Sequence, residues 1–210
     1  MSELSQETKS KILQSAKKEF LEKGFMNASL RTIASNAGLT TGAMYRHFEN
    51  KDALFCALVD DAVEVTLKLV EHGGVEYHKD LTDPAGKEHE LEEHRLSGDF
   101  LEYMQKNSDA FTLLLTKASG SKHEHFMDEV ADKYTENVFG TINYMKQKYS
   151  ITKQIDDMSI HVLATATVNA YAEVVLHKME NQEAEVFLNN IQEFFHFGFM
   201  HLLGLPCGHE

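Results

Sequence analysis

Cysteines, prolines and long apolar runs are all scarce in this 210-residue sequence. No apolar run reaches the ~18 residues that a membrane-spanning helix needs, so we expect no membrane partner. The polar and charged start of the chain does not resemble a secretory signal. The two cysteines, Cys56 and Cys207, lie far apart and lack the C-x-x-C spacing of a metal finger. The sequence therefore predicts a reduced, cytoplasmic protein rather than a disulfide scaffold.

Basic charge is also in short supply, because 20 Lys and Arg face 33 Asp and Glu, which gives a formal net charge of −13. That balance at first argues against a nucleic-acid partner. The charge is unevenly distributed, however. Residues 1–55 hold eight basic and six acidic side chains, whereas the remaining 155 residues hold 12 and 27. Any contact with DNA must therefore come from the N-terminal segment.

Apolar residues recur at helical spacing nearly everywhere, and only two prolines interrupt the chain. This pattern predicts an all-α protein. In the N-terminal third we expect helices over residues 6–23, 30–37 and 51–71, with a further helix that is capped by Thr40 or Thr41 and reaches Phe48. Residues 72–97 contain Gly73, Gly74 and dense charge, which predicts a mobile connection. Later helices are expected over 98–117, with a break near Asn107, and over 124–148, 156–180 and 183–204.

The segment from Leu30 to Leu54 reads LRTIASNAGLTTGAMYRHFENKDAL and carries the main functional signal. Small Ala34 lets two helices approach closely, and Gly38 allows a tight turn between them. The next helix then presents small and polar side chains that can enter a major groove. The N-terminal region resembles the signature of the tetracycline-repressor (TetR) family of transcription regulators. The matching positions are Ile12, Leu13, Ala16, Phe20, Gly24, Phe25, Ser29, Ile33, Ala34, Ala37, Gly38, Gly42, Tyr45, Phe48, Lys51 and Leu54.

This resemblance implies an N-terminal three-helix helix-turn-helix DNA-binding domain over residues 1–50 and a C-terminal helical ligand-binding and dimerisation domain over 51–210. Thr41 at the helix start would read bases, whereas Tyr45, His47 and Lys51 would reach phosphates. Each has a plainer interpretation: Tyr45 as a core residue, His47 as a surface histidine and Lys51 as a solvated lysine. The predicted DNA-binding residues are Ser29, Arg31, Thr40, Thr41, Gly42, Ala43, Tyr45, Arg46, His47 and Lys51.

The last two helices are apolar around most of their circumference, and a monomer has no obvious way to cover them on every side. We therefore expect a homodimer through residues 156–204. The resemblance also implies a pocket for a small-molecule effector. Asn169 and Glu173 stand out there, because polar side chains inside an apolar helix need a partner: a ligand, a histidine or the other subunit. The predicted pocket residues are Tyr103, Met104, Phe111, Phe126, Tyr134, Asn169 and Glu173.

Twelve histidines leave one alternative open. His72, His78, His89 and His94 lie among glutamates, and His123-Glu124-His125 forms a second cluster. Such sets can bind transition metals, but no H-E-x-x-H pattern occurs. The alternative is therefore a helical metal-binding protein or enzyme that uses these segments. The expected function is a ligand-responsive DNA-binding repressor that a small molecule releases from its double-stranded operator, with no cofactor, no metal site and no catalytic residue.

Overall fold

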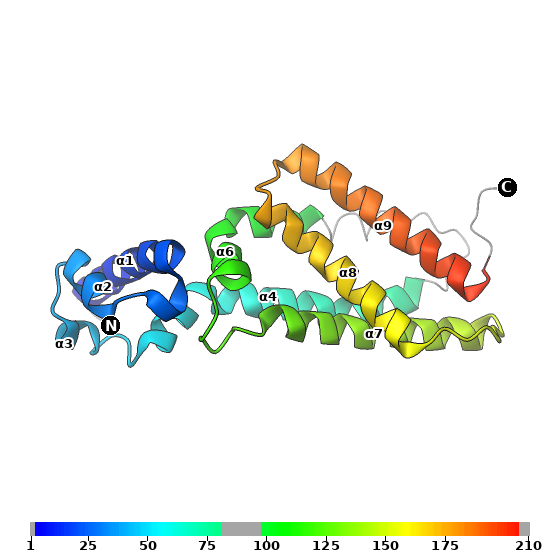
Figure 1. The fold of residues 1–210 in the computed structure, drawn as a ribbon, viewed down its shortest axis with the longest axis horizontal. Helices are drawn as coiled ribbons and strands as arrows, with labels where there is room; N and C mark the ends of the chain where they lie inside the picture. Colours follow the sequence, from blue (N-terminus) through cyan, green and yellow to red (C-terminus); the bar gives the residue numbers. More distant parts are fainter. Residues whose placement is uncertain (1–2, 81–97, 206–210) are drawn as a thin grey trace. The chain divides into compact units, whose positions relative to one another are not determined.

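The computed structural model describes residues 3–80 and 98–205, with side chains described over 5–71 and 98–205. The residues so described form helices joined by turns and short irregular segments and include no strand, which confirms the predicted all-α class (Figure 1). The chain divides into two compact units. The first comprises Met1–Val65 and Asn107–Phe126, and the second comprises Thr66–Lys106 and Met127–Glu210. The predicted boundary between residues 50 and 51 falls inside the first unit, and the assignment of functions to either side of it stays a prediction.

The first helix, α1 (Glu3–Asn27), contains a kink at Gly24, where φ is 72° and ψ is 165°. Glycine adopts positive φ without the steric cost that a Cβ brings, so it can interrupt the helix at this point. The regular helix therefore stops where the sequence predicted, and a last helical turn follows the kink. That turn leads into α2 (Leu30–Asn36).

Side chains next to the backbone define the starts of the following helices. The Ser29 hydroxyl accepts a hydrogen bond from the Thr32 amide at 3.3 Å and caps α2. Thr40 caps α3 (Thr41–Met44) by accepting from the Ala43 amide at 3.2 Å. The predicted helix to Phe48 is wrong in its length. After Met44 the backbone tightens, because the amides of Arg46 and His47 donate to carbonyls three residues back, and this ends the α-helix early.

The fourth helix, α4 (Lys51–Asp80), begins where the Asn50 side chain accepts from the Ala53 amide at 2.7 Å. It continues through Gly73 and Gly74, so the predicted end near residue 71 is wrong. Each glycine costs about 1 kcal/mol relative to alanine inside a helix, which disfavours the helix without forbidding it. The rest of the predicted mobile connection, residues 81–97, lies outside the described residues. So do the histidines at 89 and 94 and the side chains of His72 and His78.

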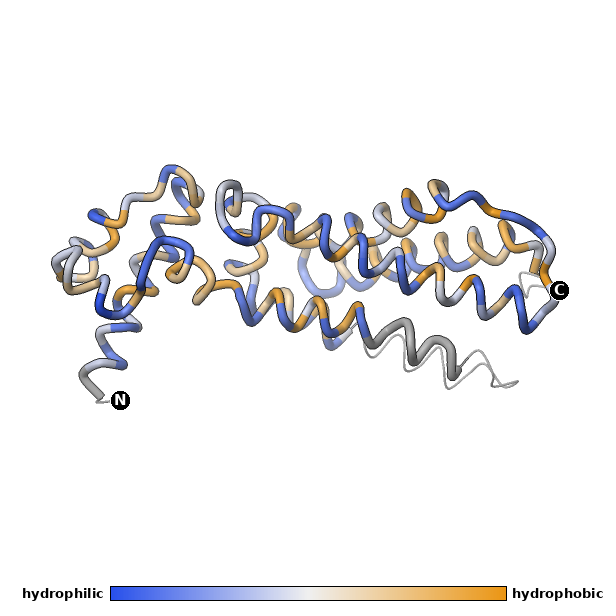
Figure 2. Tube along the Cα trace, turned by 90° about the horizontal axis from the view of Figure 1, so that it is seen from below, coloured by the Kyte–Doolittle hydropathy of each residue, from blue (hydrophilic) through white to orange (hydrophobic). Residues whose placement is uncertain are grey.

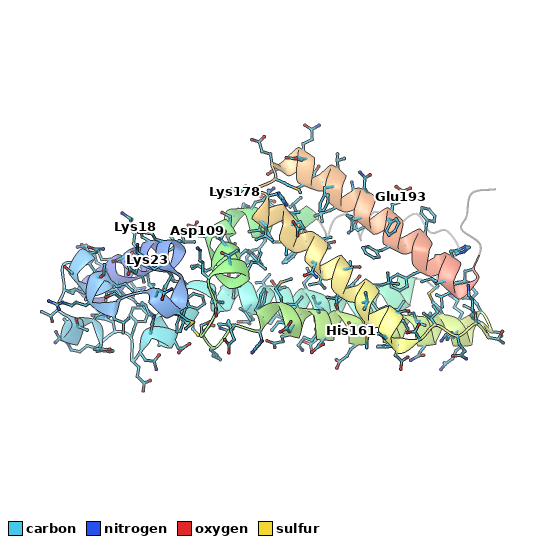
Figure 3. All side chains as sticks on the ribbon, viewed as in Figure 1. Lys18, Lys23, Asp109, His161, Lys178 and Glu193 are labelled. Atoms are coloured by element: carbon cyan, nitrogen blue, oxygen red, sulfur yellow. The ribbon has the colours of Figure 1, made fainter. Side chains whose placement is uncertain are left out.

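The core of the first unit is built around three phenylalanines. Phe20 and Phe55 make an edge-to-face contact with ring centroids 5.2 Å apart, and Phe25 lies 5.3 Å from Phe55. Fully burying such a side chain stabilises the fold by about 1.5–3 kcal/mol. A further helix, α6 (Ser108–Thr116), packs against α1. There Lys17 pairs with Asp109 at 2.7 Å, and Figure 3 labels Asp109 on α6.

The second unit contains the later part of α4, a helix over residues 98–106, α7 (Phe126–Lys148) from Met127 onward, α8 (Asp157–Leu176) and α9 (Asn181–Leu203). The predicted break near Asn107 is confirmed. α8 and α9 pack side by side and run in opposite directions (Figure 1). Hydrophilic and hydrophobic residues are interspersed along the described helices (Figure 2). A core cluster joins α7, α8 and α9 through Ile142, Met145, Ile160 and Leu203.

One side of α8 stays exposed within the single chain. Met158, Val162, Asn169 and Leu176 are exposed, at spacings that place them on one helical face. Glu173 on the same face pairs with His177 at 2.9 Å. Asn169, a polar side chain in an apolar helix, is therefore exposed in the single chain. By length and composition α8 could also cross a membrane, a test that core helices of soluble proteins pass too.

Candidate nucleic-acid interface

On its inner side the α2–turn–α3 segment is anchored by buried apolar side chains. Ile33 and Ala34 of α2 and Met44 of α3 are buried, and Phe48 follows just after α3. Gly38 takes φ of 72°, which turns the chain sharply between the two helices. The Ser15 hydroxyl of α1 donates to the Ile33 carbonyl at 2.9 Å and ties α2 to the first helix. These contacts hold α2 and α3 in a defined arrangement.

The opposite side of this segment is exposed and mostly polar. Tyr45 is 46% exposed, which excludes the interpretation of Tyr45 as a core residue. The structure places the ten predicted residues on α2, α3 and their flanks, in two groups by exposure. Arg31, Thr40, Gly42, Tyr45 and Arg46 are exposed, and Ser29, Thr41, Ala43, His47 and Lys51 are half-buried. Exposed Arg, Tyr and Thr donors beside a small residue are suited to phosphate and base-edge contacts.

Gly42 gives α3 its closest possible approach to a partner. A Cβ built at this position would meet no heavy atom within 4 Å, so the space in front of it is open. Its φ is not positive, and no backbone requirement of the fold calls for glycine. The absence of a side chain at Gly42 therefore has no explanation within the protein itself, but it would let the α3 backbone come close to a surface such as a groove edge.

Lys51 has partners within the protein that the sequence did not reveal. Its ammonium donates to the Met26 carbonyl at 2.9 Å and lies 4.9 Å from the centroid of the Phe25 ring. Burial lowers the pKa of Lys51, while the charges of Asp52 and Glu19 oppose that shift. Lys51 thus holds the connection between α1 and α2. An ammonium has three donors, so a phosphate contact would add to this role.

Glu19 also supports the interface and was not singled out from the sequence. It lies buried in α1, and its carboxylate accepts a hydrogen bond from the Ser29 amide at 3.0 Å. Because the Ser29 side chain caps α2 at the same time, this residue is engaged on both its amide and its hydroxyl. The only sequence signal for Glu19 was an acidic residue next to the apolar stripe of α1.

Comparison with known proteins identifies this arrangement. Residues 12–58 match the family described as bacterial regulatory proteins, tetR family, which covers most of α1, all of α2 and α3, and the start of α4. The N-terminal segment of this chain therefore carries the TetR-family motif. The predicted resemblance is thereby confirmed.

Curated relatives match part of this chain. It is 38% identical to the HTH-type transcriptional regulator TtgR of Pseudomonas putida over 84 residues, which is 40% of this chain and 39% of TtgR. It is 29% identical to the HTH-type transcriptional repressor AcnR of Corynebacterium diphtheriae over 120 residues, which is 46% of this chain and 63% of AcnR. The chain spans less than two thirds of the length of these curated relatives.

Solved structures with the TetR fold match over most of the chain. The fatty acid degradation regulator FadR from Bacillus halodurans aligns with a TM-score of 0.55 and 14% identity, covering 96% of this chain and 99% of FadR. The TetR family regulator PfmR from Thermus thermophilus aligns with a TM-score of 0.54 and 19% identity, covering 88% and 97%. At these identities the likeness shows the fold, and it confirms a helix-turn-helix segment followed by a helical body.

The seven predicted pocket residues are divided between the two units. Phe111 and Phe126 are buried in the first unit. Met104 is buried in the second unit, where Tyr103 and Tyr134 are half-buried. The remaining two, Asn169 and Glu173, lie on the exposed face of α8 described above. The grouping of all seven residues into one pocket stays a prediction.

Proposed function

We propose that this chain is a DNA-binding transcription regulator, not an enzyme, and that it represses transcription in the cytoplasm. The observation that carries the proposal is the exposed polar face of α2 and α3, set on a buried apolar anchor inside the TetR-family motif. Residues 1–50 would serve as the DNA-binding domain, and residues 51–210 would bind the effector and the second subunit. The ten predicted residues, from Ser29 to Lys51, would contact the operator.

Selection of DNA from a random pool tests this function without knowledge of the operator. A repressor of this kind should enrich one sequence with two related half-sites about one helical turn, ~34–36 Å, apart. Binding to the enriched sequence should exceed binding to a scrambled version and should weaken with salt. A pool that shows no enrichment after repeated rounds contradicts the proposal. The metal-enzyme alternative gains no support from the comparisons.

A homodimer through residues 156–204 is part of the same proposal. Its support is the exposed apolar surface of α8 and α9, where Val162 is 55% exposed and Phe194 is 69% exposed. A second copy would cover this surface and would also give Asn169 and Glu173 partners across the interface. Two subunits related by two-fold symmetry would present two α3 helices to the two half-sites of an operator.

A small-molecule effector would bind in the second unit. Among the described residues, two buried side-chain atoms have no hydrogen-bond partner, Gln105 Nε2 and Thr165 Oγ1. Leaving such groups unpaired costs about 1–3 kcal/mol each, which a ligand or an ordered water with hydrogen-bonding groups would recover. We place the pocket near these atoms and near Tyr103, Met104 and Tyr134. In a thermal-shift screen, Gln105→Leu should abolish the response to a true effector.

The conformational change that releases DNA would be transmitted through α4. This helix contributes residues 51–65 to the first unit and its later residues to the second, so a change at one end can reach the other. Because Gly73 and Gly74 lie inside α4, the helix itself would transmit the change. Couplings of ~1–3 kcal/mol correspond to roughly 5–150-fold in DNA affinity, and operator DNA must weaken effector binding by the same factor. Effector titrations with and without operator measure this reciprocity, and equal affinities would contradict it.

A further inference from the structure

Three different metal-ligating side chains meet in the first unit, away from the α2–α3 face. Cys56 and Asp60 are one turn apart on α4 and share a face. His123, from the segment between α6 and α7, points its Nε2 at Asp60 Oδ1, 2.7 Å away. The thiol, carboxylate and imidazole ligand atoms all lie within 4.8 Å of one another. His123 is only 9% exposed, so its imidazole is held in place by the fold.

We propose that Cys56, Asp60 and His123 form a binding site for a divalent transition metal ion of the zinc class. Thiolate, imidazole and carboxylate are the donors that Zn²⁺ takes in proteins, usually in a tetrahedral arrangement. At typical zinc–ligand distances the donors of such a site lie about 3.3–3.7 Å apart. The observed separations, from 2.7 Å between His123 and Asp60 to at most 4.8 Å within the set, bracket that spacing. A water molecule would supply the fourth ligand.

The surroundings are suited to an ion that binds from solvent. The Asp60 side chain is 57% exposed, which leaves a path to the site, while His123 closes its inner side. The loop around His123 is fixed by two hydrogen bonds: the His123 amide donates to the Ser121 hydroxyl at 3.2 Å, and the Lys122 amide donates to Asp52 at 2.9 Å. A preorganised loop lowers the entropic cost of assembling the ligands.

The chemistry at Cys56 is a simple exchange of a proton for the metal. Burial, together with the neighbouring Asp60 carboxylate, raises the pKa of Cys56, so the metal-free thiol is protonated near neutral pH. On binding, the S–H bond breaks, the sulfur lone pair forms the S–metal bond and the proton leaves to solvent. No oxidant or reductant is consumed.

A metal at this position would join α4 to the segment that supports the start of α2. The Lys117 carbonyl accepts a hydrogen bond from the Phe25 amide at 2.8 Å, and the Ser119 hydroxyl lies 3.8 Å from Met26 Sδ. Both contacts reach the α1–α2 connection that Lys51 also holds. An ion at His123 would therefore stabilise the first unit. Any effect on operator affinity rests on the proposed function, whereas binding of the metal does not.

This site differs from the two histidine clusters visible in the sequence. His125 pairs at 3.5 Å with its exposed neighbour Glu124, whose other oxygen accepts from the Gly120 amide at 3.0 Å. Only His123 of that cluster joins the site. The partners of His123 come from α4, more than 60 positions earlier in the chain.

Cobalt titration of the reduced full-length protein tests the proposal directly. Co²⁺ bound by a thiolate gives a sulfur-to-metal charge-transfer band in the near ultraviolet, which histidine-only sites lack. We expect this band to saturate at one Co²⁺ per chain and to disappear when Zn²⁺ is added. Cys207→Ser and His125→Gln should retain it as matched controls, while Cys56→Ser and His123→Gln should lose it. Wild-type protein without the band, or a band that survives Cys56→Ser, overturns the proposal.

A second measurement avoids variants of the site itself. In Cys207→Ser protein, Cys56 is the only cysteine in the chain. Alkylation of its thiol by iodoacetamide should slow at least tenfold when Zn²⁺ is present, and Mg²⁺ should have no effect. The thermal midpoint should rise with Zn²⁺ concentration in the same protein. Equal alkylation rates with and without Zn²⁺ would refute the site even if Cys56→Ser or His123→Gln failed to fold.

Discussion

Replacement of Gly42 by alanine should affect the stability of the protein and its affinity for DNA in opposite directions. Gly42 lies in α3 with no positive φ, and an added Cβ meets no heavy atom within 4 Å. The protein alone therefore accommodates the methyl group without strain. Alanine also loses less backbone entropy on folding, so Gly42→Ala should raise the free energy of unfolding by about 0.5–1 kcal/mol.

The same methyl group should weaken DNA binding. If the α3 backbone approaches the groove closely at Gly42, a Cβ there displaces one or more groove contacts in each half-site. Loss of one specific contact typically costs ~1–3 kcal/mol, so we expect DNA affinity to fall roughly 5–150-fold. Because the variant should be more stable than the wild type, its lower affinity for DNA could not be explained by a general folding defect.

Urea denaturation and fluorescence anisotropy with the selected DNA measure the two effects on one preparation. Gly98→Ala is a matched control, because a Cβ at Gly98 also meets nothing within 4 Å and Gly98 is helical in the second unit. It should change stability by a similar amount and leave DNA binding unchanged. If Gly42→Ala binds the selected DNA like wild type, the α3 backbone does not approach DNA at this residue.

Four further changes test other parts of the structure. Lys51→Ala removes the hydrogen bond to the Met26 carbonyl and the contact with the Phe25 ring, so the free energy of unfolding measured in urea should fall by about 1–2 kcal/mol. An unchanged salt dependence of DNA binding in this variant would argue against a phosphate contact. Thr41→Ala should alter the base preference of the selected sequence at constant stability, and an identical sequence would remove Thr41 from base reading. Phe194→Glu should shift the sedimentation mass from two chains to one, and a wild-type mass of one chain would contradict the dimer. Gly120→Ala places a Cβ 2.8 Å from Met26 Cγ at φ of +83°, so its thermal midpoint should drop by the equivalent of about 1–2 kcal/mol, and an unchanged midpoint would refute that strain.

Local chemistry explains which features of the first unit could be predicted. Ser29, Thr40 and Asn50 cap their helices, and such caps are predictable because a cap requires only a side-chain oxygen within three residues of a free amide. Gly24 and Gly38 interrupt or end helices because glycine, which has no Cβ, adopts a positive φ at little steric cost. The lengths of α3 and α4 were harder to predict. Helix ends depend on small differences in backbone free energy that packing easily overrides.

The burial of individual side chains was harder to predict from the sequence. Asn169 lies among apolar residues of α8, but the structure exposes it, whereas Tyr45 is exposed as its predicted phosphate contact requires. Phe111 and Phe126 are buried in the first unit, whereas Tyr103, Met104 and Tyr134 belong to the second, and their grouping into one pocket stays a prediction. An apolar pattern indicates that a face is covered, but it does not specify which element covers it.

By itself the sequence determined the all-α class, the helix caps and the TetR-family motif, since all of these depend on residues close together in the chain. Tertiary structure alone decided the partners that lie far apart in sequence. Lys51 meets the Met26 carbonyl across 25 positions, and His123 meets Asp60 across 63. The reason is physical: periodicity and capping are set by interactions within a few residues, whereas a contact between distant segments depends on how whole helices pack, and no short stretch of sequence encodes that packing.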